Sequence, residues 1–295
     1  MQWDDLRYFL AVARSGQLAR AAALLAVDAT TVGRRVRRLE QALDQRLFEQ
    51  SRDGQSLTKA GQQLLVKVEE IERSASDIES HPAVGSAVSG LLRVSVSEGF
   101  GTWFVAHHLK SFTAAYPGIE VDLVASSGFL SPSRRETDVA ILLARPQRGP
   151  LVSGRLCEYG LRLYASRAYL DETGPIDEVA QLYSRALIGY IPDSIYAPEL
   201  RYLGEIAPNL PVRIRSSSIN AQYRLTASGA GIAVLPCFIG DADTQLVRIL
   251  AEVRILRSFW LVTHEDSRRL PRIAAFVNWI TALIDRHRER MLGKE

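Results

Sequence analysis

DATTVGRRVRRLEQAL, residues 28–43, is the stretch that decides how the first part of this chain folds. At about 3.6 residues per turn, its branched apolar side chains stack on one face of a helix. These side chains are Val32, Val36, Leu39 and Leu43. Asp28 stands at the start, where a carboxylate accepts the free backbone N–H groups of a first turn. The stretch therefore predicts an amphipathic helix with one face in a core.

The opposite face of this helix is basic. It gathers Thr30, Arg34, Arg37, Arg38 and Gln41, with Thr31 and Arg35 at its border. Solvated helix faces usually mix charges of both signs, whereas four arginines within residues 34–38 repel one another unless an anion compensates. From the helix alone two interpretations stay open: a basic surface, or a helix that lies in a DNA major groove.

The composition sets outer bounds on the function. The 295 residues are enough for two or three domains with cores of their own. The net charge is only +3, so affinity for nucleic acid must come from a local patch. Cys157 and Cys237 are too few for a disulfide framework and lack zinc spacing, so we expect buried thiols in a reducing compartment.

Targeting and membrane segments are not expected. Asp4, Asp5 and Arg7 interrupt the N-terminus, so it has no apolar signal core. The longest uncharged run, residues 225–240, contains glycines, a proline and polar residues and does not suit a membrane span. We therefore expect a cytoplasmic protein that does not contact the membrane.

The neighbours of residues 28–43 fit a helix-turn-helix with a wing. Its expected elements are helices over about 4–15 and 18–25, a turn at 27–29, and strands at 47–49 and 56–58. Asp53-Gly54 is a strong hairpin signal between these strands. Arg52 at the hairpin tip could reach a phosphate or the minor groove, and a solvated turn arginine is an equally open interpretation.

The order and spacing of several short segments resemble a known family. They are Leu6-Arg7-Tyr8-Phe9, Ala21-Ala22, Arg37-Arg38-Leu39-Glu40, Arg46-Leu47-Phe48-Glu49 and Leu57-Thr58 followed by Gly61. Over about 60 residues this resembles the winged helix-turn-helix of the LysR-type transcriptional regulators. Ala29 and Gly33 depart from the glutamine and serine that the family often has there, which bears on the operator sequence more than on DNA binding.

The resemblance implies that double-stranded operator or promoter DNA is a partner. We predict base contacts from Thr30, Thr31, Arg34 and Arg35. We predict phosphate contacts from Arg37 and Arg38, with Arg52 as a contact of the wing.

Residues 59–89 are expected to form a linker helix that ends in a hinge. An apolar a/d pattern recurs over about two and a half heptads, at Leu64, Val68, Ile71, Ala75 and Ile78. Packing onto the chain's own domain would give a similar stripe, but the strict period and the charged flanks favour a second helix. We predict a homodimer through this helix, and the resemblance implies a homotetramer. Paired recognition helices would read half-sites about one turn of DNA apart.

Residues 90–295 alternate strands with helices. Strands are expected at 91–97, 119–124, 138–143, 160–165, 186–190, 212–215, 231–236 and 260–263, and helices at 100–116, at 218–227 and from 271. This alternation predicts an α/β fold of parallel sheets with helices on both faces. Two turns, 97–102 and 216–220, place backbone N–H groups at helix starts beyond strand ends, where ligands of such sheets bind. Simple serine caps are the alternative interpretation of these turns.

The same order resembles the effector domain of LysR-type regulators, which is similar to two-lobed periplasmic binding proteins. The match rests on residues 116–121, 137–141, 163–170 and 227–236. It implies a small-molecule effector between the lobes. The implied lining is Ser97, Thr102, Ser127, Arg145, Ser218 and Asn220. Glu98 at the cleft edge is unfavourable for an acidic effector and could instead pair with a cationic group or with Arg145.

Covalent chemistry has no recognisable motif in this sequence. A nucleophile elbow, a P-loop, a dinucleotide fingerprint and metal spacing are all missing. His107 and His108 are adjacent, so on a helix they point about 100° apart and chelate one metal poorly. We expect no enzyme activity, no cofactor and no metal.

We therefore interpret the chain as a LysR-type regulator with three parts. These are a winged helix-turn-helix over 1–58, a linker over 59–89 and an effector domain over 90–295. RNA polymerase is a further expected partner if the protein activates transcription. A solute-binding protein with an appended interaction domain is the alternative class, and the missing signal peptide disfavours it.

Overall fold

The computed structural model describes residues 2–51, 54–79, 88–126, 136–147 and 149–294. The chain divides into two compact units, Met1–His81 and Pro82–Glu295. Each unit has its own hydrophobic core, and the two are described in turn. None of the helices within the described ranges is long and apolar enough to cross a membrane.

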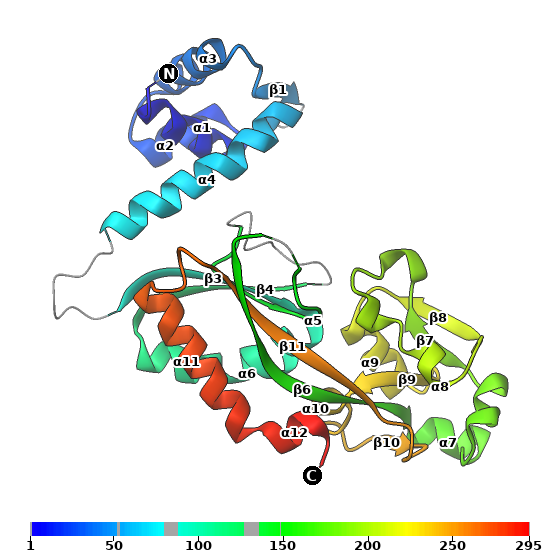
Figure 1. Ribbon diagram of the computed structural model, residues 1–295. Helices are drawn as coiled ribbons and strands as arrows, with labels where there is room; N and C mark the ends of the chain where they lie inside the picture. The colour runs from blue at the N-terminus through cyan, green and yellow to red at the C-terminus, as the bar shows by residue number, and fades with distance from the viewer. Residues whose placement is uncertain (1, 52–53, 80–87, 127–135, 148, 295) are drawn as a thin grey trace. The chain divides into compact units, whose positions relative to one another are not determined.

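The first unit is a winged helix-turn-helix followed by a long helix (Figure 1). Its elements are α1 Asp4–Ser15, α2 Leu18–Leu25, α3 Ala29–Leu43, β1 Phe48–Ser51, β2 Gly54–Leu57 and α4 Lys59–Glu79. β1 and β2 pair as an antiparallel hairpin, as the Asp-Gly signal predicts. Gly54 has a φ of +138°, and a Cβ there would lie 2.3 Å from the carbonyl oxygen of Gly16. Only glycine therefore allows the wing to approach the turn between α1 and α2 this closely.

α3 has the predicted start and the predicted buried face. The Asp28 carboxylate accepts a hydrogen bond from the Thr31 backbone N–H at 2.7 Å, which satisfies a free donor of the first turn. Val32, Val36 and Leu39 are buried against α1 and α2, and Leu43 packs at the edge of the same core. The apolar face of residues 28–43 is thus the centre of the first unit.

α4 uses part of its apolar stripe within its own unit. Leu64 and Val68 pack against the core of the winged helix-turn-helix, and Val68 is only 3% exposed. Ile71, the next position of the stripe, is 39% exposed. The side chains of Ala75 and Ile78 lie outside the described residues. Packing onto the chain's own domain therefore accounts for the first half of the heptad pattern, and the predicted pairing with a second helix depends on the remainder.

The second unit is an α/β module. Its first half contains β3 Ser89–Ser97, α5 Glu98–Phe100, the π-helix η1 Gly101–Val105, α6 Ala106–Ala115, β4 Gly118–Ser126, β5 Val139–Leu142, β6 Leu151–Ser166, α7 Arg167–Thr173 and η3 Val179–Ser184. Its second half contains β7 Leu187–Tyr190, η4 Pro192–Ser194, η5 Pro198–Leu200, α8 Leu203–Ile206, β8 Val212–Ser216, α9 Ile219–Ala227, β9 Ile232–Pro236, α10 Cys237–Gly240, β10 Leu246–Ile249, β11 Ile255–His264, α11 Pro271–Arg286 and α12 Arg288–Leu292.

The strands of this unit form a mixed sheet, whereas the sequence predicted parallel sheets. Within the described ranges the strand order is β4-β3-β5-β11-β6-β9-β7-β8, and β10 pairs with β6. β3 runs parallel to β4 and β5, and β7 runs parallel to β8 and β9. β11 and β6 are antiparallel to each other and form long strands through the middle (Figure 1). They join two lobes, one around β3, β4 and α6 and the other around β7, β8 and α9.

The helix predicted over 100–116 is interrupted. A π-helical turn, η1, separates α5 from α6. At Gly101 an added Cβ would lie 2.5 Å from Val96 Cγ2 and 2.6 Å from Ala125 Cβ, so glycine lets this turn pack directly on β3 and β4. Such π turns occur frequently at functional sites. This one carries Thr102 and Trp103 to the cleft between the lobes.

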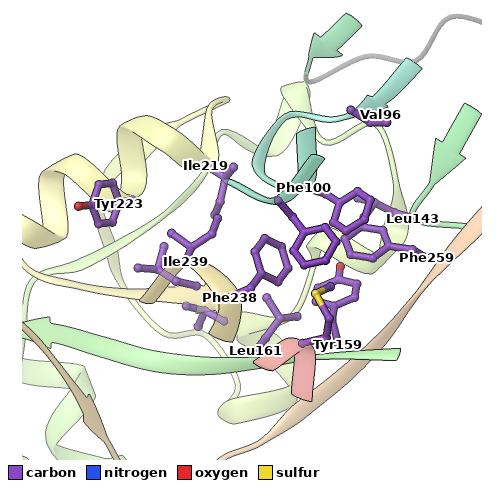
Figure 2. Close-up of a cluster of buried hydrophobic side chains, with 14 of the residues drawn as sticks. Val96, Phe100, Leu143, Tyr159, Leu161, Ile219, Tyr223, Phe238, Ile239 and Phe259 are labelled. Atoms are coloured by element: carbon purple, nitrogen blue, oxygen red, sulfur yellow. The ribbon is translucent and has the colours of Figure 1, made fainter. Parts of the chain in front are cut away.

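Aromatic side chains fill the core beneath the cleft. The Phe259 ring lies 4.4 Å from Phe100 and 4.2 Å from Tyr159, measured between centroids. Phe238 packs edge-on against Phe100 (Figure 2). These rings come from α5, β6, α10 and β11, so their packing holds these four elements together beneath the cleft.

Candidate nucleic-acid interface and ligand cleft

The exposed face of α3 divides into two stripes. Thr30, Arg34 and Arg37 are spaced by four and three residues and are all exposed. Arg34 and Arg37 form no ion pair with any residue that the structure describes. Thr31, Arg35 and Arg38 have the same spacing one position further round and are only partly exposed. The first stripe therefore faces outward, with Arg34 and Arg37 available to contact a ligand, and the second stripe borders on α1.

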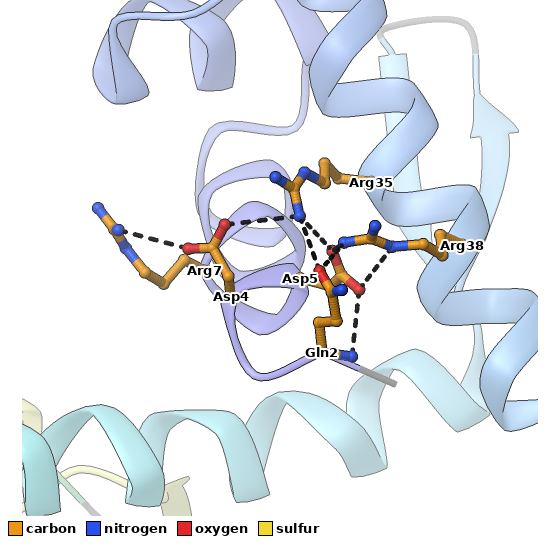
Figure 3. A network of polar contacts seen from close by, with 6 residues as sticks. All are labelled: Gln2, Asp4, Asp5, Arg7, Arg35 and Arg38. Carbon is orange, nitrogen blue, oxygen red and sulfur yellow. Dashed lines mark hydrogen bonds and ion pairs between the residues drawn. The ribbon is translucent and has the colours of Figure 1, made fainter.

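Arg35 and Arg38 converge on a buried carboxylate, Asp5 of α1 (Figure 3). Arg38 Nε donates to Asp5 Oδ2 at 2.9 Å, and its Nη2 also donates to Asp5 Oδ1. Arg35 Nη1 donates to Asp5 Oδ1 at 3.2 Å and lies 3.6 Å from Asp4 Oδ2. Gln2 Oε1 accepts from Arg38 Nη2 at 2.8 Å. This network, which we call the Asp5 network, fixes α3 to α1.

Electrostatics keep the Asp5 network charged. Burial alone raises the pKa of Asp5, but hydrogen bonds from Arg38 and Arg35 outweigh it and lower the pKa below 3.8. The Asp5 side chain has no exposed surface, whereas those of Arg35 and Arg38 keep 26% and 42% of theirs. Each guanidinium therefore has N–H groups left for a second acceptor such as a phosphate.

The two threonines at the start of α3 are already hydrogen-bonded to Asp28. Thr31 Oγ1 donates to Asp28 Oδ2 at 2.9 Å, and Thr30 Oγ1 donates to Asp28 Oδ1. Hydrogen bonds from the Thr30 hydroxyl and from the Thr31 backbone and hydroxyl lower the pKa of Asp28 to about 2. The hydroxyl oxygens still have lone pairs, so the threonines remain able to accept from base amino groups. Arg52 lies outside the described residues.

In the second unit Glu98 links the two lobes. Its carboxylate accepts from Ser218 Oγ at 2.7 Å, from the Ile219 backbone N–H at 3.1 Å and from Asn220 Nδ2 at 3.1 Å. Ser218 also caps α9, because its Oγ accepts from the Ala221 backbone N–H at 3.1 Å. The N-terminus of α9, where the sequence predicted a ligand, therefore holds a carboxylate of the chain itself.

Asn220 also connects the two lobes, through hydrogen bonds with residues of the π-helical turn η1. Trp103 Nε1 donates to Asn220 Oδ1 at 2.8 Å, and Asn220 Nδ2 donates to Thr102 Oγ1 at 3.2 Å. The structure thus brings four of the predicted cleft residues together: Glu98, Thr102, Ser218 and Asn220. Trp103 was missed, because nothing in the sequence distinguishes it from the apolar residues around it.

The other predicted cleft residues have different surroundings. Arg145 lies over the Trp260 ring, 5.5 Å from its centroid, and its Nε lies 3.4 Å from Ser153 Oγ. The pairing of Arg145 with Glu98 that the sequence left open is replaced by these contacts. Ser97 is buried and lines the cavity described next. Ser127 lies outside the described residues.

A cavity of about 40 Å³ lies beside the Glu98 link. Tyrosines, phenylalanines and two carboxylates make up most of its wall. The wall includes Glu98, Tyr159, Tyr190, Tyr196, Glu199 and Tyr202. Sequence reasoning missed Tyr196, Glu199 and Tyr202, because residues 191–202 are irregular apart from the short 3₁₀ turns η4 and η5 and have no periodic pattern.

The two thiols and His108 have surroundings that the structure describes. Burial raises the pKa of Cys157 to about 12, and burial also raises the pKa of Cys237. His108 Nδ1 lies 2.9 Å from the Phe104 carbonyl oxygen, and its ring packs near His287. Across the described ranges no group of three or more histidines, cysteines or acidic residues is placed to hold a metal ion.

Comparisons with known proteins match both units. Residues 3–62 match the model of the bacterial regulatory helix-turn-helix protein, lysR family, and residues 85–284 match that of the LysR substrate binding domain. The chain is 30% identical over 289 residues to the Mau operon transcriptional activator of Paracoccus denitrificans, covering 96% of each. It is 27% identical to the glycine cleavage system transcriptional activator of Escherichia coli K12, covering 95% of this chain and 92% of that one.

A solved structure agrees with the sequence matches. CrgA, a LysR-type transcriptional regulator from Neisseria meningitidis, aligns with a TM-score of 0.60 at 25% identity. The alignment covers 96% of this chain and 98% of that one. The predicted order of a helix-turn-helix followed by a substrate-binding domain is confirmed by these matches.

Proposed function

The chain belongs to the LysR family of bacterial transcriptional regulators, and we propose that it reads DNA mainly with the exposed stripe Thr30, Arg34 and Arg37 of α3. Arginine and threonine side chains near the start of a recognition helix suit base edges in the major groove. The observation that carries this assignment is the exposure of Arg34 and Arg37 without an acidic partner among the described residues. Such side chains can turn to DNA without breaking an internal contact.

The second stripe has a different role in this proposal. Arg35 and Arg38 are held by Asp5, so their geometry is set before DNA arrives. Their remaining N–H groups contact phosphates and fix the register of α3 in the groove. Thr31 acts with them through its free lone pairs. Arg35 thus moves from the predicted base contacts to the phosphate contacts, and Arg37 moves in the opposite direction.

Association of two chains would present α3 twice. We propose a homodimer through α4 from Ile71 onward, within a homotetramer, because the Ile71 side chain is 39% exposed. Arg14 Nη2 donates to Glu72 Oε2 at 2.6 Å, so an ion pair joins α1 to α4 beside Ile71. Two half-sites about one turn apart would then be bound together, with RNA polymerase as a partner at activated promoters. A regulator that binds the chromosome acts in the cytoplasm.

The second unit couples this binding to a small molecule. A ligand between the lobes changes DNA binding only through different affinities for the two arrangements of the regulator. The Glu98 link spans the same cleft, so a ligand that contacts Glu98 acts directly on how the lobes are joined. The proposal assigns no covalent chemistry to this cleft.

Binding to labelled DNA from immediately upstream of the protein's own gene tests the α3 assignment. With Arg34→Ala we expect the preference for this DNA over a scrambled duplex to fall about tenfold or more, as for the loss of a good base contact. Lys110→Ala is the matched control, because it removes one positive charge from an exposed position in the other unit. If Arg34→Ala and Lys110→Ala bind both duplexes as the unaltered chain does, α3 is not the reading helix.

A further inference from the structure

The wall of the cavity beside Glu98 is acidic and aromatic. Glu98 and Glu199 both line it, and no lysine, arginine or histidine is among the described residues of the wall. Glu199 Oε2 is buried and has no hydrogen-bond partner within the described part of the chain. A buried carboxylate oxygen without a donor is unfavourable, and a ligand that donates hydrogen bonds would satisfy it.

One cation close to the wall, Arg257, is already paired elsewhere. Arg257 influences the pKa values of Tyr159 and Tyr202, so its charge is felt at the wall. Its Nη2, however, pairs with Glu205, and its Nε donates to the backbone oxygen of Glu199 at 3.1 Å. Arg257 therefore holds the segment that carries Glu199 without neutralising its carboxylate directly.

Anionic ligands meet an obstacle in this cleft. The N-terminus of α9 is the feature that would attract them, and Glu98 occupies it through Ile219 N–H and Ser218 Oγ. An anion would have to displace this carboxylate and then remain near its negative charge. A cation meets no such competition, because Glu98 accepts two hydrogen bonds at Oε1 and one at Oε2, which leaves an acceptor position on Oε2.

The rings suit a cation with an apolar body. Tyr159 stacks on Phe259 with their planes 14° apart, and Tyr190 meets Tyr202 edge to face. Burial and the Glu98 charge raise the pKa of Tyr196 to about 12, so this phenol stays neutral. Ring faces attract ammonium groups, and the cavity of about 40 Å³ has room for only a few heavy atoms.

We propose that this cleft binds a small organic ammonium ion, with Glu98 and Glu199 as its counter-charges and the tyrosine and phenylalanine rings as its walls. This ligand class rests on the proposed function, in which the second unit senses a small molecule. Because Glu98 also holds α9, an ammonium group that hydrogen-bonds to Glu98 redistributes the bonds that join the lobes. Binding of a positively charged ligand thereby changes the hydrogen bonds that hold the two lobes together.

Propylammonium chloride is a suitable probe, with 1-propanol and sodium propionate as neutral and anionic counterparts at equal ionic strength. The readout is the temperature at which the second unit unfolds within the full chain, as the concentration of each probe rises. We expect a saturable rise with propylammonium and none with the counterparts. Glu98→Gln and Glu199→Gln each keep the side-chain shape and remove one charge, and each should weaken propylammonium binding about tenfold or more.

Glu252→Gln is the matched control, since it removes the same charge at an exposed position away from the wall, and it should bind propylammonium like the unaltered chain. If Glu98→Gln fails to fold, Glu199→Gln still decides, because it is Glu98, and not Glu199, whose carboxylate accepts the described hydrogen bonds from Ser218, Ile219 and Asn220. Propionate binding as tightly as propylammonium would overturn the proposal. So would unchanged affinity in the folded glutamine variants, or no saturable effect of propylammonium.

DNA binding by the same preparations separates this proposal from the proposed function. Binding of upstream DNA without any response to propylammonium overturns the ligand class alone. A saturable propylammonium response in a chain that binds no DNA supports the ligand class and overturns the role of α3.

Discussion

Replacing Asp5 with asparagine tests whether the Asp5 network positions α3. The substitution keeps the size of the side chain and one acceptor oxygen, but removes the charge on which Arg35 and Arg38 converge. A hydrogen bond to a charged group contributes about 1.5–3 kcal/mol. Arg35 and Arg38 keep 26% and 42% of their surface, so water compensates much of this loss. We therefore expect the free energy of unfolding of the first unit to fall by about 1–2 kcal/mol.

This loss is measurable by thermal unfolding. For a unit of the size of Met1–His81, about 1 kcal/mol shifts the unfolding temperature by about 4–8 °C. Asp4→Asn is the matched control, because Asp4 is 44% exposed and pairs with Arg7 and Arg35 at the surface. The control should shift the unfolding temperature far less than Asp5→Asn. The difference between the two variants isolates the contribution of the buried carboxylate.

The same substitution changes DNA binding in a defined direction. Without Asp5 the two guanidinium groups carry one more uncompensated positive charge towards DNA. The slope of log affinity against log salt should become steeper by about 0.9 for each added phosphate contact. Preference for upstream DNA over a scrambled duplex should fall, because the arginines are no longer held in position. A stability like that of Asp4→Asn, together with an unchanged or shallower salt slope, would refute this reasoning.

Three further predictions concern the helix cap, the aromatic floor and the thiols. The pKa of Asp28 is about 2, so its stabilisation of α3 is present above about pH 4 and is lost as pH falls towards 2; circular dichroism should find this acid dependence missing in Asp28→Ser. Phe259→Ala removes a ring that contacts Phe100 and Tyr159, and should lower the free energy of unfolding of the second unit by about 3–5 kcal/mol in denaturant titrations. Cys237 is buried and Cys157 is partly buried, and burial raises the pKa of both thiols, so each should react with a chromogenic disulfide reagent at pH 8 much more slowly than an exposed thiol; rapid labelling of the folded chain would contradict this.

Features that depend on neighbours in sequence could be predicted. The helix over 28–43 and its Asp28 cap follow from period and from a local hydrogen bond, and both are present. The heptad pattern of α4 was ambiguous in principle, because the same stripe serves a partner helix or the chain's own core. Leu64 and Val68 pack in the core of the first unit, and residue spacing alone does not show this.

Features that depend on residues far apart in the sequence could not be predicted. Asp5 and Arg38 are 33 positions apart, and Glu98 and Ser218 are 120 apart, so local patterns reveal neither the ion pair of the first two nor the hydrogen bond of the second two. The sequence indicates that Glu98 is unfavourable for an acidic effector. Its hydrogen bonds to the start of α9 could not be predicted, because they depend on how the two lobes pack. Glu199 was missed altogether, since a glutamate in an irregular segment usually faces water.

Selection of bound sequences from a random DNA pool by the full chain, compared with Arg34→Ala, tests the central claim most directly. The unaltered chain should enrich a motif with two half-sites spaced by about one turn of DNA. Arg34→Ala should keep the spacing and lose the base preference at one position of each half-site. Enrichment of the same motif by both proteins, or of none by the unaltered chain, would contradict the assignment of α3 as the helix that reads DNA.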